Sequence, residues 1–361
     1  MANTIHFPES VKKDFVEKFN IESETNDLFT HDLDMEFSGV KTVHVKTVKS
    51  EPLQDYNRAK EVGTGSRYGK TTEVGDHEIT YTMGQDKSLS LSIDKGNQKE
   101  NFNQPQAGRV MKAERQERIV PTVDKYRLDK WAKQAGIHEA LSAAPNKSTI
   151  LQQIMDLKSK MVDAGCPENG IQLRVARKYA TTLKLSDEWV KLNDLGSKTL
   201  PKGTMGELDG MPTKFITSGK MPANVPFMMI HKGSCISPMK INDFKVHIDP
   251  PGLSGDLIEF RLMYDAFVLG HKAVGVACGC LPGTVVATPQ IALSTNEATI
   301  TCATSGTPSI YYTLDGSDPR YSVDKKLYSA KLTLNPGDEL RAYAEKDGLF
   351  WSDVASVDYT G

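Results

Sequence analysis

Residue types that carry out chemistry occur throughout this chain, but their spacing does not form a known catalytic set. There is no His-Glu-x-x-His zinc motif, no serine within Gly-x-Ser-x-Gly and no Cys-x-x-Cys pair. The 8 histidines are scattered, and His231 and His247 fit core or interface positions better than the role of a base or a ligand. The sequence therefore predicts that the protein is not an enzyme.

Two loops resemble ligand sites without completing them. Residues 63–69 are glycine-rich, but they lack the Lys-Ser/Thr ending of a phosphate-binding loop and no helix follows them. Asp315 and Asp318 lie in a turn with glycine and proline, where turn capping explains them better than calcium binding. Cys278 and Cys280 are the only close cysteine pair, and partners for a metal are missing. We therefore predict no cofactor and no bound metal.

Length, charge and hydropathy limit the class of protein. The 361 residues suffice for two or three domains, and 39% hydrophobic with 25% charged residues is typical of a soluble globular chain. The net charge of −2 gives no global basic field to attract nucleic acid. No apolar run reaches the length of a membrane span, and the first residues lack the apolar stretch of a signal peptide. We expect a protein used in the cytosol unless something else exports it.

Residues 106–136 are the longest stretch that favours a helix. Apolar residues recur three and four positions apart from Val110 to Ala135, and basic residues outnumber acidic ones between them. Pro121 removes a backbone donor, so we expect a bend there, and Gly136 stands where a C-terminal glycine cap belongs. At about 1.5 Å per residue the helix would be roughly 45 Å long. We therefore predict a spine that runs across the molecule.

Shorter elements surround this predicted spine. Residues 8–21 favour an amphipathic helix, with apolar residues at four-residue steps, and residues 37–48 favour a strand. Residues 62–93 favour a long β excursion with little core of its own. Helices and strands then alternate over residues 146–231, as in a compact α/β domain, and long strands return over residues 240–276. This succession predicts an α+β fold.

The C-terminal fifth of the chain has a different character. Residues 282–289 form a linker between two prolines, and residues 290–361 contain short alternating strands with turns such as Asp315-Gly316 between them. This pattern predicts a small, separable β-sandwich. Its expected core consists of Ile300, Tyr312, Leu332, Leu340, Tyr343 and Val357.

Several stretches, taken in their order along the chain, carry a resemblance to a known family. Residues 85–95 followed by residues 120–128 look like a passage from an extended loop to a spine helix, and residues 206–212, His231 and residues 257–270 look like a closing segment. This order resembles the major capsid proteins of tailed phages of the Hong Kong 97 type. The resemblance covers about residues 1–281.

The resemblance implies a Hong Kong 97-like capsid fold and its usual parts. These are an N-terminal arm (residues 1–36), a peripheral domain (37–145 and 240–281) with an extended loop (62–93) and the spine helix (106–136), and an axial domain (146–239). It implies a major capsid protein of the virion, assembled in the host cytoplasm into an icosahedral shell. Its implied partners are further copies of itself in pentamers and hexamers, a scaffolding protein, a portal protein and double-stranded DNA bound without sequence specificity.

Residues of the extended loop and the spine are the expected shell contacts. They are Lys70, Tyr81, Lys87, Arg115 and Arg118. For the two arginines, contact with a neighbour or solvent is favoured over contact with the genome. Some members of the family cross-link a loop lysine to an asparagine of the closing strands, but residues 245–276 contain no asparagine. We therefore expect a shell held by non-covalent contacts, and a scaffolding protein that is a separate chain.

The C-terminal segment resembles a second family, the immunoglobulin-like domain at the C-terminus of chitobiases and hexosaminidases. Residues 310–319 and 340–344 carry this resemblance. As part of a capsid protein, the domain would decorate the outer surface. Two alternatives remain open at this point. One is an encapsulin-like cellular shell, and the other is a carbohydrate-binding surface protein that recognises glycans through Tyr311, Tyr343 and Trp351.

Overall fold

The computed structural model describes residues 23–30, 36–38, 42–48, 55–59, 67–68, 76–96, 107–186 and 206–359. The chain forms two compact units, of which the smaller comprises residues 33–83 and the larger the rest. Both helices and strands occur, as the predicted α+β class requires. The helix predicted at residues 8–21 and the expected contact Lys70 lie outside the described residues.

The smaller unit contains an antiparallel three-stranded sheet. Its strands are β1 (Glu36–Ser38), β2 (Thr42–Val48) and β3 (Asp76–Thr82), in the order β1-β2-β3. The strand predicted at residues 37–48 is therefore two strands, β1 and β2, which pair with each other. Ile79 and Tyr81, two residues apart on β3, are both buried, as the alternation of a strand requires.

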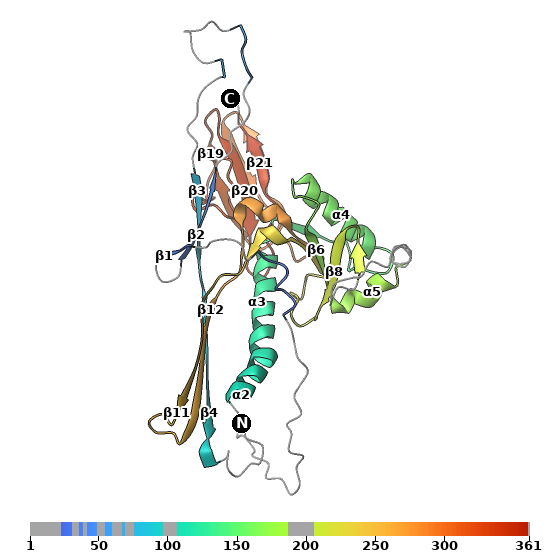
Figure 1. The fold of residues 1–361 in the computed structure, drawn as a ribbon. Coiled ribbons are helices and arrows are strands. Elements are labelled where there is room, and N and C mark those ends of the chain that lie inside the picture. Colours follow the sequence, from blue (N-terminus) through green and yellow to red (C-terminus); the bar gives the residue numbers. More distant parts are fainter. Residues whose placement is uncertain are drawn as a thin grey trace. The chain divides into compact units, whose positions relative to one another are not determined.

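The predicted spine is a helix with one irregular turn (Figure 1). It consists of α2 (Ala107–Glu114), the π-helical turn η1 (Arg115–Ile119) and α3 (Val120–Lys133). Pro121 lies just after η1. Because proline has no N–H and its ring crowds the carbonyl four residues earlier, which belongs to Glu117, the wider π turn relieves the strain. The irregularity predicted at Pro121 is therefore present, one turn before the proline.

Gly136 is required for close approach rather than as a left-handed cap. A Cβ there would lie 2.3 Å from the carbonyl oxygen of Ala273, and the Gly136 N–H donates to the carbonyls of Ala273 and Val276 at 3.1 and 3.0 Å. The helix ends at Lys133, and the chain passes directly into a sheet. Gly136 therefore marks the joint between the spine and the α/β part of the chain.

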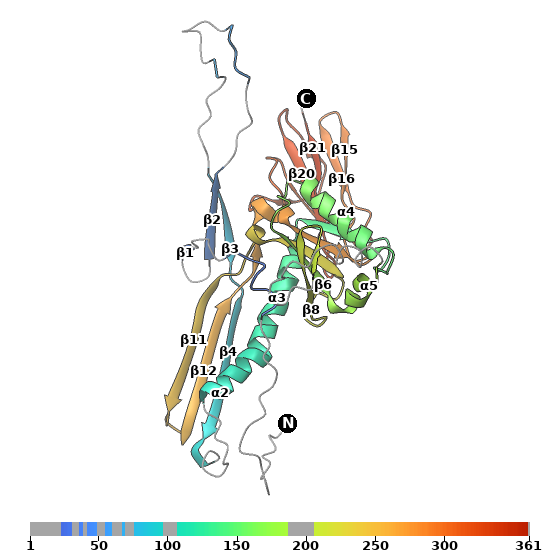
Figure 2. The same cartoon turned by 45° about the vertical axis from the view of Figure 1, so that its right-hand side comes forward.

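A long antiparallel sheet runs beside the spine (Figure 2). Its strands are β11 (Met239–Ile248), β12 (Gly255–Tyr264) and β4 (Gln85–Asp94), in the order β11-β12-β4. Residues 85–94, predicted as part of a projecting loop, therefore pair within the larger unit. The register places Phe244, Phe260 and Leu89 side by side, so one face of the sheet is apolar. Part of that face packs against Ile119 and Val123 of the spine.

The α/β part contains a six-stranded mixed sheet. Its order is β5-β14-β9-β6-β8-β7. The strands are β5 (Ile137–Ala140), β14 (Val276–Cys280), β9 (Phe227–His231), β6 (Ile171–Ala176), β8 (Met211–Ile216) and β7 (Gly206–Leu208). β5 and β14 lie outside residues 146–239, the range predicted for the axial domain, and β14 overlaps the end of the long strands predicted over residues 240–276. The sheet therefore includes the residues that follow the spine and those that precede the C-terminal segment.

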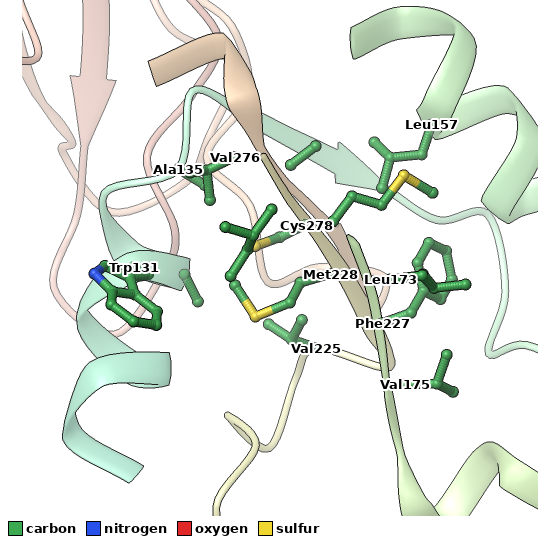
Figure 3. Close-up of a cluster of buried hydrophobic side chains, with 14 of the residues drawn as sticks. Trp131, Ala135, Leu157, Leu173, Val175, Val225, Phe227, Met228, Val276 and Cys278 are labelled. Atoms are coloured by element: carbon green, nitrogen blue, oxygen red, sulfur yellow. The ribbon is translucent and has the colours of Figure 1, made fainter. Parts of the chain in front are cut away.

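Helices from different parts of the chain pack on the two faces of this sheet (Figure 3). Trp131 of α3 lies beside Met228 and Val276, whereas Leu157 of α4 (Ile150–Asp163) lies on the side of Leu173. All five side chains are fully buried. The shorter helix α5 (Ala180–Lys184) follows β6. The spine and the sheet therefore share one core.

The C-terminal segment forms two small sheets, as predicted. One has the order β15-β16-β19 and the other β18-β17-β20-β21. The strands are β15 (Gln290–Ser294), β16 (Glu297–Thr301), β17 (Ser309–Thr313), β18 (Lys326–Leu327), β19 (Leu332–Thr333), β20 (Glu339–Glu345) and β21 (Ala355–Asp358). Ala298, Ile300, Leu334, Leu340 and Ala342 form the buried core between the sheets.

Candidate functional site

A short segment near the N-terminus, residues 23–30, joins the spine to the α/β sheet. Asp124 of α3 accepts hydrogen bonds from Ser23 Oγ (2.6 Å), Glu24 N (3.0 Å) and Thr25 Oγ1 (2.7 Å). Asp124 also accepts a hydrogen bond from Lys220 Nζ at 2.9 Å, and the side chains of Asp124 and Lys220 are both buried. Burial alone would raise the pKa of Asp124, but the hydrogen bonds from Ser23 and Thr25 outweigh it and hold the pKa below its usual value.

The same segment binds the sheet through a second carboxylate. Asp27 Oδ2 accepts from Arg174 Nη2 at 2.8 Å and from Lys214 Nζ at 2.5 Å. Arg174 is fully buried on β6. Burial opposes ionisation of Asp27, yet the two cations hold its pKa below the usual value. Without Asp27, Arg174 would be a buried charge with no carboxylate partner in the described part of the chain.

Aromatic and cationic groups complete this joint. Arg127 of α3 donates to Ser237 Oγ at 2.8 Å and lies over the ring of Phe29, 4.7 Å from its centroid. Phe29 also contacts Trp131, with ring centroids 6.0 Å apart. Together these contacts fix the orientation of the spine relative to the sheet. No sequence signal marked them, because the partners lie about a hundred residues apart along the chain.

Two grooves lie between the spine and the β11-β12-β4 sheet, one on each side of η1. The larger has a volume of about 350 Å³ and is lined by Arg115, and the smaller, of about 210 Å³, is lined by Arg118 and Lys87. The structure thus brings Lys87 and Arg118 together and places Arg115 on the other flank. Tyr81, by contrast, is buried in the smaller unit. Three of the five expected shell contacts therefore border grooves in the larger unit.

β11 exposes apolar side chains along an edge of the sheet. Phe244, Val246 and Ile248 alternate along the strand and are 43%, 40% and 75% exposed. They share the apolar face of the sheet, since Phe244 pairs with Phe260 and Val246 with Ile258. A long edge strand with exposed apolar residues is a template for association with another chain.

The C-terminal segment is docked onto the end of the spine. Arg320 Nη1 donates to the carbonyl of Gly136 at 2.6 Å, and Tyr321 Oη donates to that of Gln134 at 2.7 Å. The ring of Phe350 stacks on His138 of β5, with centroids 5.3 Å apart. Arg320 and Tyr321 thus satisfy two carbonyls in the residues that directly follow α3.

Residues 282–289, which the sequence predicts as a linker, also pack against the C-terminal segment. Val286 is buried, and its N–H donates to the carbonyl of Phe350 at 3.0 Å. The N–H of Phe350 in turn donates to Thr284 O at 2.8 Å. Thr284 and Val286 therefore pair with the C-terminal segment, a contact that the change of composition at residues 282–289 does not reveal.

The three aromatic residues proposed for glycan binding do lie together. Tyr311 and Tyr343 stack with centroids 5.7 Å apart, and Trp351 meets Tyr343 edge-on at 5.8 Å. However, Tyr343 is 0% exposed. Lys325 Nζ lies over both tyrosine rings, at 4.9 and 5.4 Å from their centroids. The ring faces are thus engaged within the protein, and Tyr311 and Trp351 are only partly exposed.

Two features are absent from the described residues. They contain no group of three or more histidine, cysteine, aspartate or glutamate side chains placed to hold a metal ion. Within the same part of the chain, no helix is long and apolar enough to cross a membrane. Asp315 receives hydrogen bonds from Ser317 N and Oγ, at 3.1 and 2.6 Å, as the turn-capping interpretation predicts.

Comparison with solved structures places this architecture among phage capsids. A chain from Mycobacterium phage Che8 superposes with a TM-score of 0.57 at 18% identity, over 77% of this chain and 98% of that one. A chain from the capsid of the cyanophage P-SCSP1u gives a TM-score of 0.57 at 10% identity, over 76% and 93%. The mature capsid of bacteriophage PhiM1 gives 0.55 at 13% identity, over 77% and 93%.

Sequence comparison adds one local match. The family model described as Fn3 associated matches residues 298–359. No curated protein matches the chain. The C-terminal segment thus resembles a known module, whereas the likeness to chitobiases stays a prediction. The structural matches, over 76–77% of this chain, show that it shares the fold of phage capsid chains.

Proposed function

We propose that this chain is the major capsid protein of a tailed phage, and that its copies form an icosahedral shell around double-stranded DNA. The observation that carries the proposal is the extent of the structural match, which spans 98% of the Che8 phage chain and 93% of each of two capsid chains. A match over nearly the whole of those chains is expected when two proteins share an architecture rather than one motif.

The exposed face of β11 supports the proposal. Phe244, Val246 and Ile248 present apolar area to solvent in the single chain, which is unfavourable by about 25 cal/mol per Å². In a shell, a neighbouring copy would cover Val246 and Ile248, and burial of their apolar area would favour assembly. Pentamers and hexamers of the chain are the assemblies that we propose.

Other partners of the proposed shell follow from the charges and from the C-terminal segment. The net charge of −2 suits a shell that encloses DNA without binding it tightly, while a scaffolding protein and a portal protein guide assembly. Lys87, Arg115 and Arg118 are exposed beside the two grooves and would contact neighbouring copies. The C-terminal segment would lie on the outer surface, where it takes no volume from the genome.

Assembly of charged variants tests this proposal. The chain, expressed with a scaffolding protein, should sediment as shells, and Val246→Asp combined with Ile248→Asp should give folded subunits that make none. Val323→Asp is the matched control, because Val323 is 74% exposed in the C-terminal segment. Shells from the double variant would contradict the role of β11. Purified particles that contain protein cargo and no nucleic acid would favour the encapsulin-like alternative.

A further inference from the structure

The larger groove beside η1 has an apolar floor that the described residues leave open. Eight of its lining residues are apolar, from the spine and from β11 and β12: Met111, Ile119, Val120, Val123, Met239, Phe244, Phe260 and Leu262. Its polar groups at one end, including Asp124 and Arg127, already bond to residues 23–26. The groove is therefore suited to apolar side chains rather than to a polar small molecule.

Ser23, the first residue that the structure describes, lies at one end of this groove. Ser23 lines the groove and donates to Asp124 Oδ1 at 2.6 Å. The residues immediately before it must therefore start from this position. Along the spine, Met111 lies thirteen residues before Asp124, a distance of about 20 Å at 1.5 Å per residue. The groove thus extends from the start of the described chain toward the beginning of the spine.

The preceding residues match the groove in length and in pattern. Residues 8–21 would span about 21 Å as a helix, nearly the distance from Asp124 to Met111. Val11, Phe15 and Phe19 recur at four-residue steps and would form one apolar stripe. A segment tethered directly to the groove also has an effective concentration that a separate partner would not reach.

We propose that residues 8–21 of the same chain bind in this groove as an amphipathic helix, parallel to the spine. The apolar stripe would face Met111, Ile119 and Phe244, and the charged residues of the segment would face solvent. Because this contact forms within one chain, it does not depend on shell assembly.

Cysteine cross-linking tests this placement in unassembled subunits. Val11→Cys and Met111→Cys, introduced with Cys302→Ser, should form an intramolecular disulfide on mild oxidation, since the other native cysteines are buried. The matched control replaces Met111→Cys with Lys125→Cys, an exposed position on α3 that lines neither groove. The control pair should cross-link much less.

Each result decides the proposal. A monomeric cross-linked band that requires Met111→Cys, and that is lost when Phe15→Asp and Phe19→Asp are added, supports binding within the chain. A cross-linked dimer means that the segment binds a second copy, and equal cross-linking of the control pair means that it does not occupy the groove. Either of these outcomes overturns the proposal. An unchanged circular dichroism spectrum establishes that the variants are folded.

Discussion

Lys220 Nζ lies 2.9 Å from Asp124 Oδ2, and both side chains are buried where the spine meets the α/β sheet. The lysine follows β8 and the aspartate belongs to α3. Their ion pair, together with residues 23–25, adds to the shared core in fixing the angle between the spine and the sheet. In a shell subunit that angle would set the geometry of contacts between neighbours.

Removal of the Asp124 carboxylate should therefore destabilise the larger unit strongly. Asp124→Ala removes the buried partner of Lys220 and leaves it only the more exposed carboxylate of Glu24, 3.5 Å from Lys220 Nζ. We expect a loss of about 3 kcal/mol, the lower end of the range for breaking a buried ion pair. The midpoint of denaturant unfolding should fall accordingly. Asp129→Ala is the control, because Asp129 pairs with Lys133 on the exposed side of α3 and its loss should change little. Equal effects of the two substitutions would contradict the buried role of Asp124.

Stability should depend on pH through His138. Burial lowers the pKa of His138 to about 4, against an ordinary value near 6.5. Between these values the unfolded chain binds a proton that the folded chain does not, so stability should fall by about 3 kcal/mol as the pH drops from 7 to 4. The pKa of His271 is also lowered by burial and adds to this slope.

His138→Phe isolates that contribution. The substitution keeps an aromatic ring against Phe350 but removes the titrating group. The free energy of unfolding, measured from pH 7 to pH 4, should then have a shallower slope than in the parent. An unchanged slope would mean that His138 is protonated in the folded protein.

Loss of Arg320 should loosen the C-terminal segment. Arg320→Ala leaves the Gly136 carbonyl without its side-chain donor and Asp318 without its partner, a penalty of about 1–3 kcal/mol. Amide hydrogen exchange should quicken at Val286 and Phe350, which the docked segment protects. Lys331→Ala should leave these rates as they are, since Lys331 pairs with Glu297 on the exposed surface.

The core of the spine offers a fourth test. Trp131 is fully buried between the spine, Phe29 and the sheet. Trp131→Ala should cost about 3–5 kcal/mol, because the cavity left behind cannot close completely. Unfolding at the same denaturant concentration as the parent would show that the tryptophan is not part of this core.

The periodicity of apolar residues predicted the helices and strands in which buried residues recur at regular intervals along the chain. The apolar stripe of α4 and the run of β6 at Ile171–Ala176 were predicted because one face, or both, is buried continuously. The short strand β5 was not predicted, since four residues directly after a helix are too few to show a regular alternation of apolar and polar side chains. Tyr343 was predicted in the core of the C-terminal segment, but it lies on the other face of β20 from Leu340 and Ala342 and contacts Trp351.

The contacts that join the N-terminal segment, the spine, the six-stranded sheet and the C-terminal segment could not be predicted from the sequence for a different reason. Asp27 with Arg174, and Arg320 with Gly136, are pairs far apart along the chain, and no motif in the sequence links the two members of either pair. Only the folded topology brings them together. Tyr311, Tyr343 and Trp351 lie together, but no motif marked the contact of Lys325 with the ring of Tyr343 or the complete burial of that ring.

Electron cryomicroscopy of particles formed by this chain tests the capsid assignment most directly. The chain, expressed with a scaffolding protein, should give closed icosahedral particles whose lattice consists of pentamers and hexamers. Each subunit density should fit the spine, the β11-β12-β4 sheet and the six-stranded sheet. The face of β11 that bears Val246 and Ile248 should be covered by a neighbour. A chain that remains monomeric, or a lattice that leaves this face in solvent, would contradict the account.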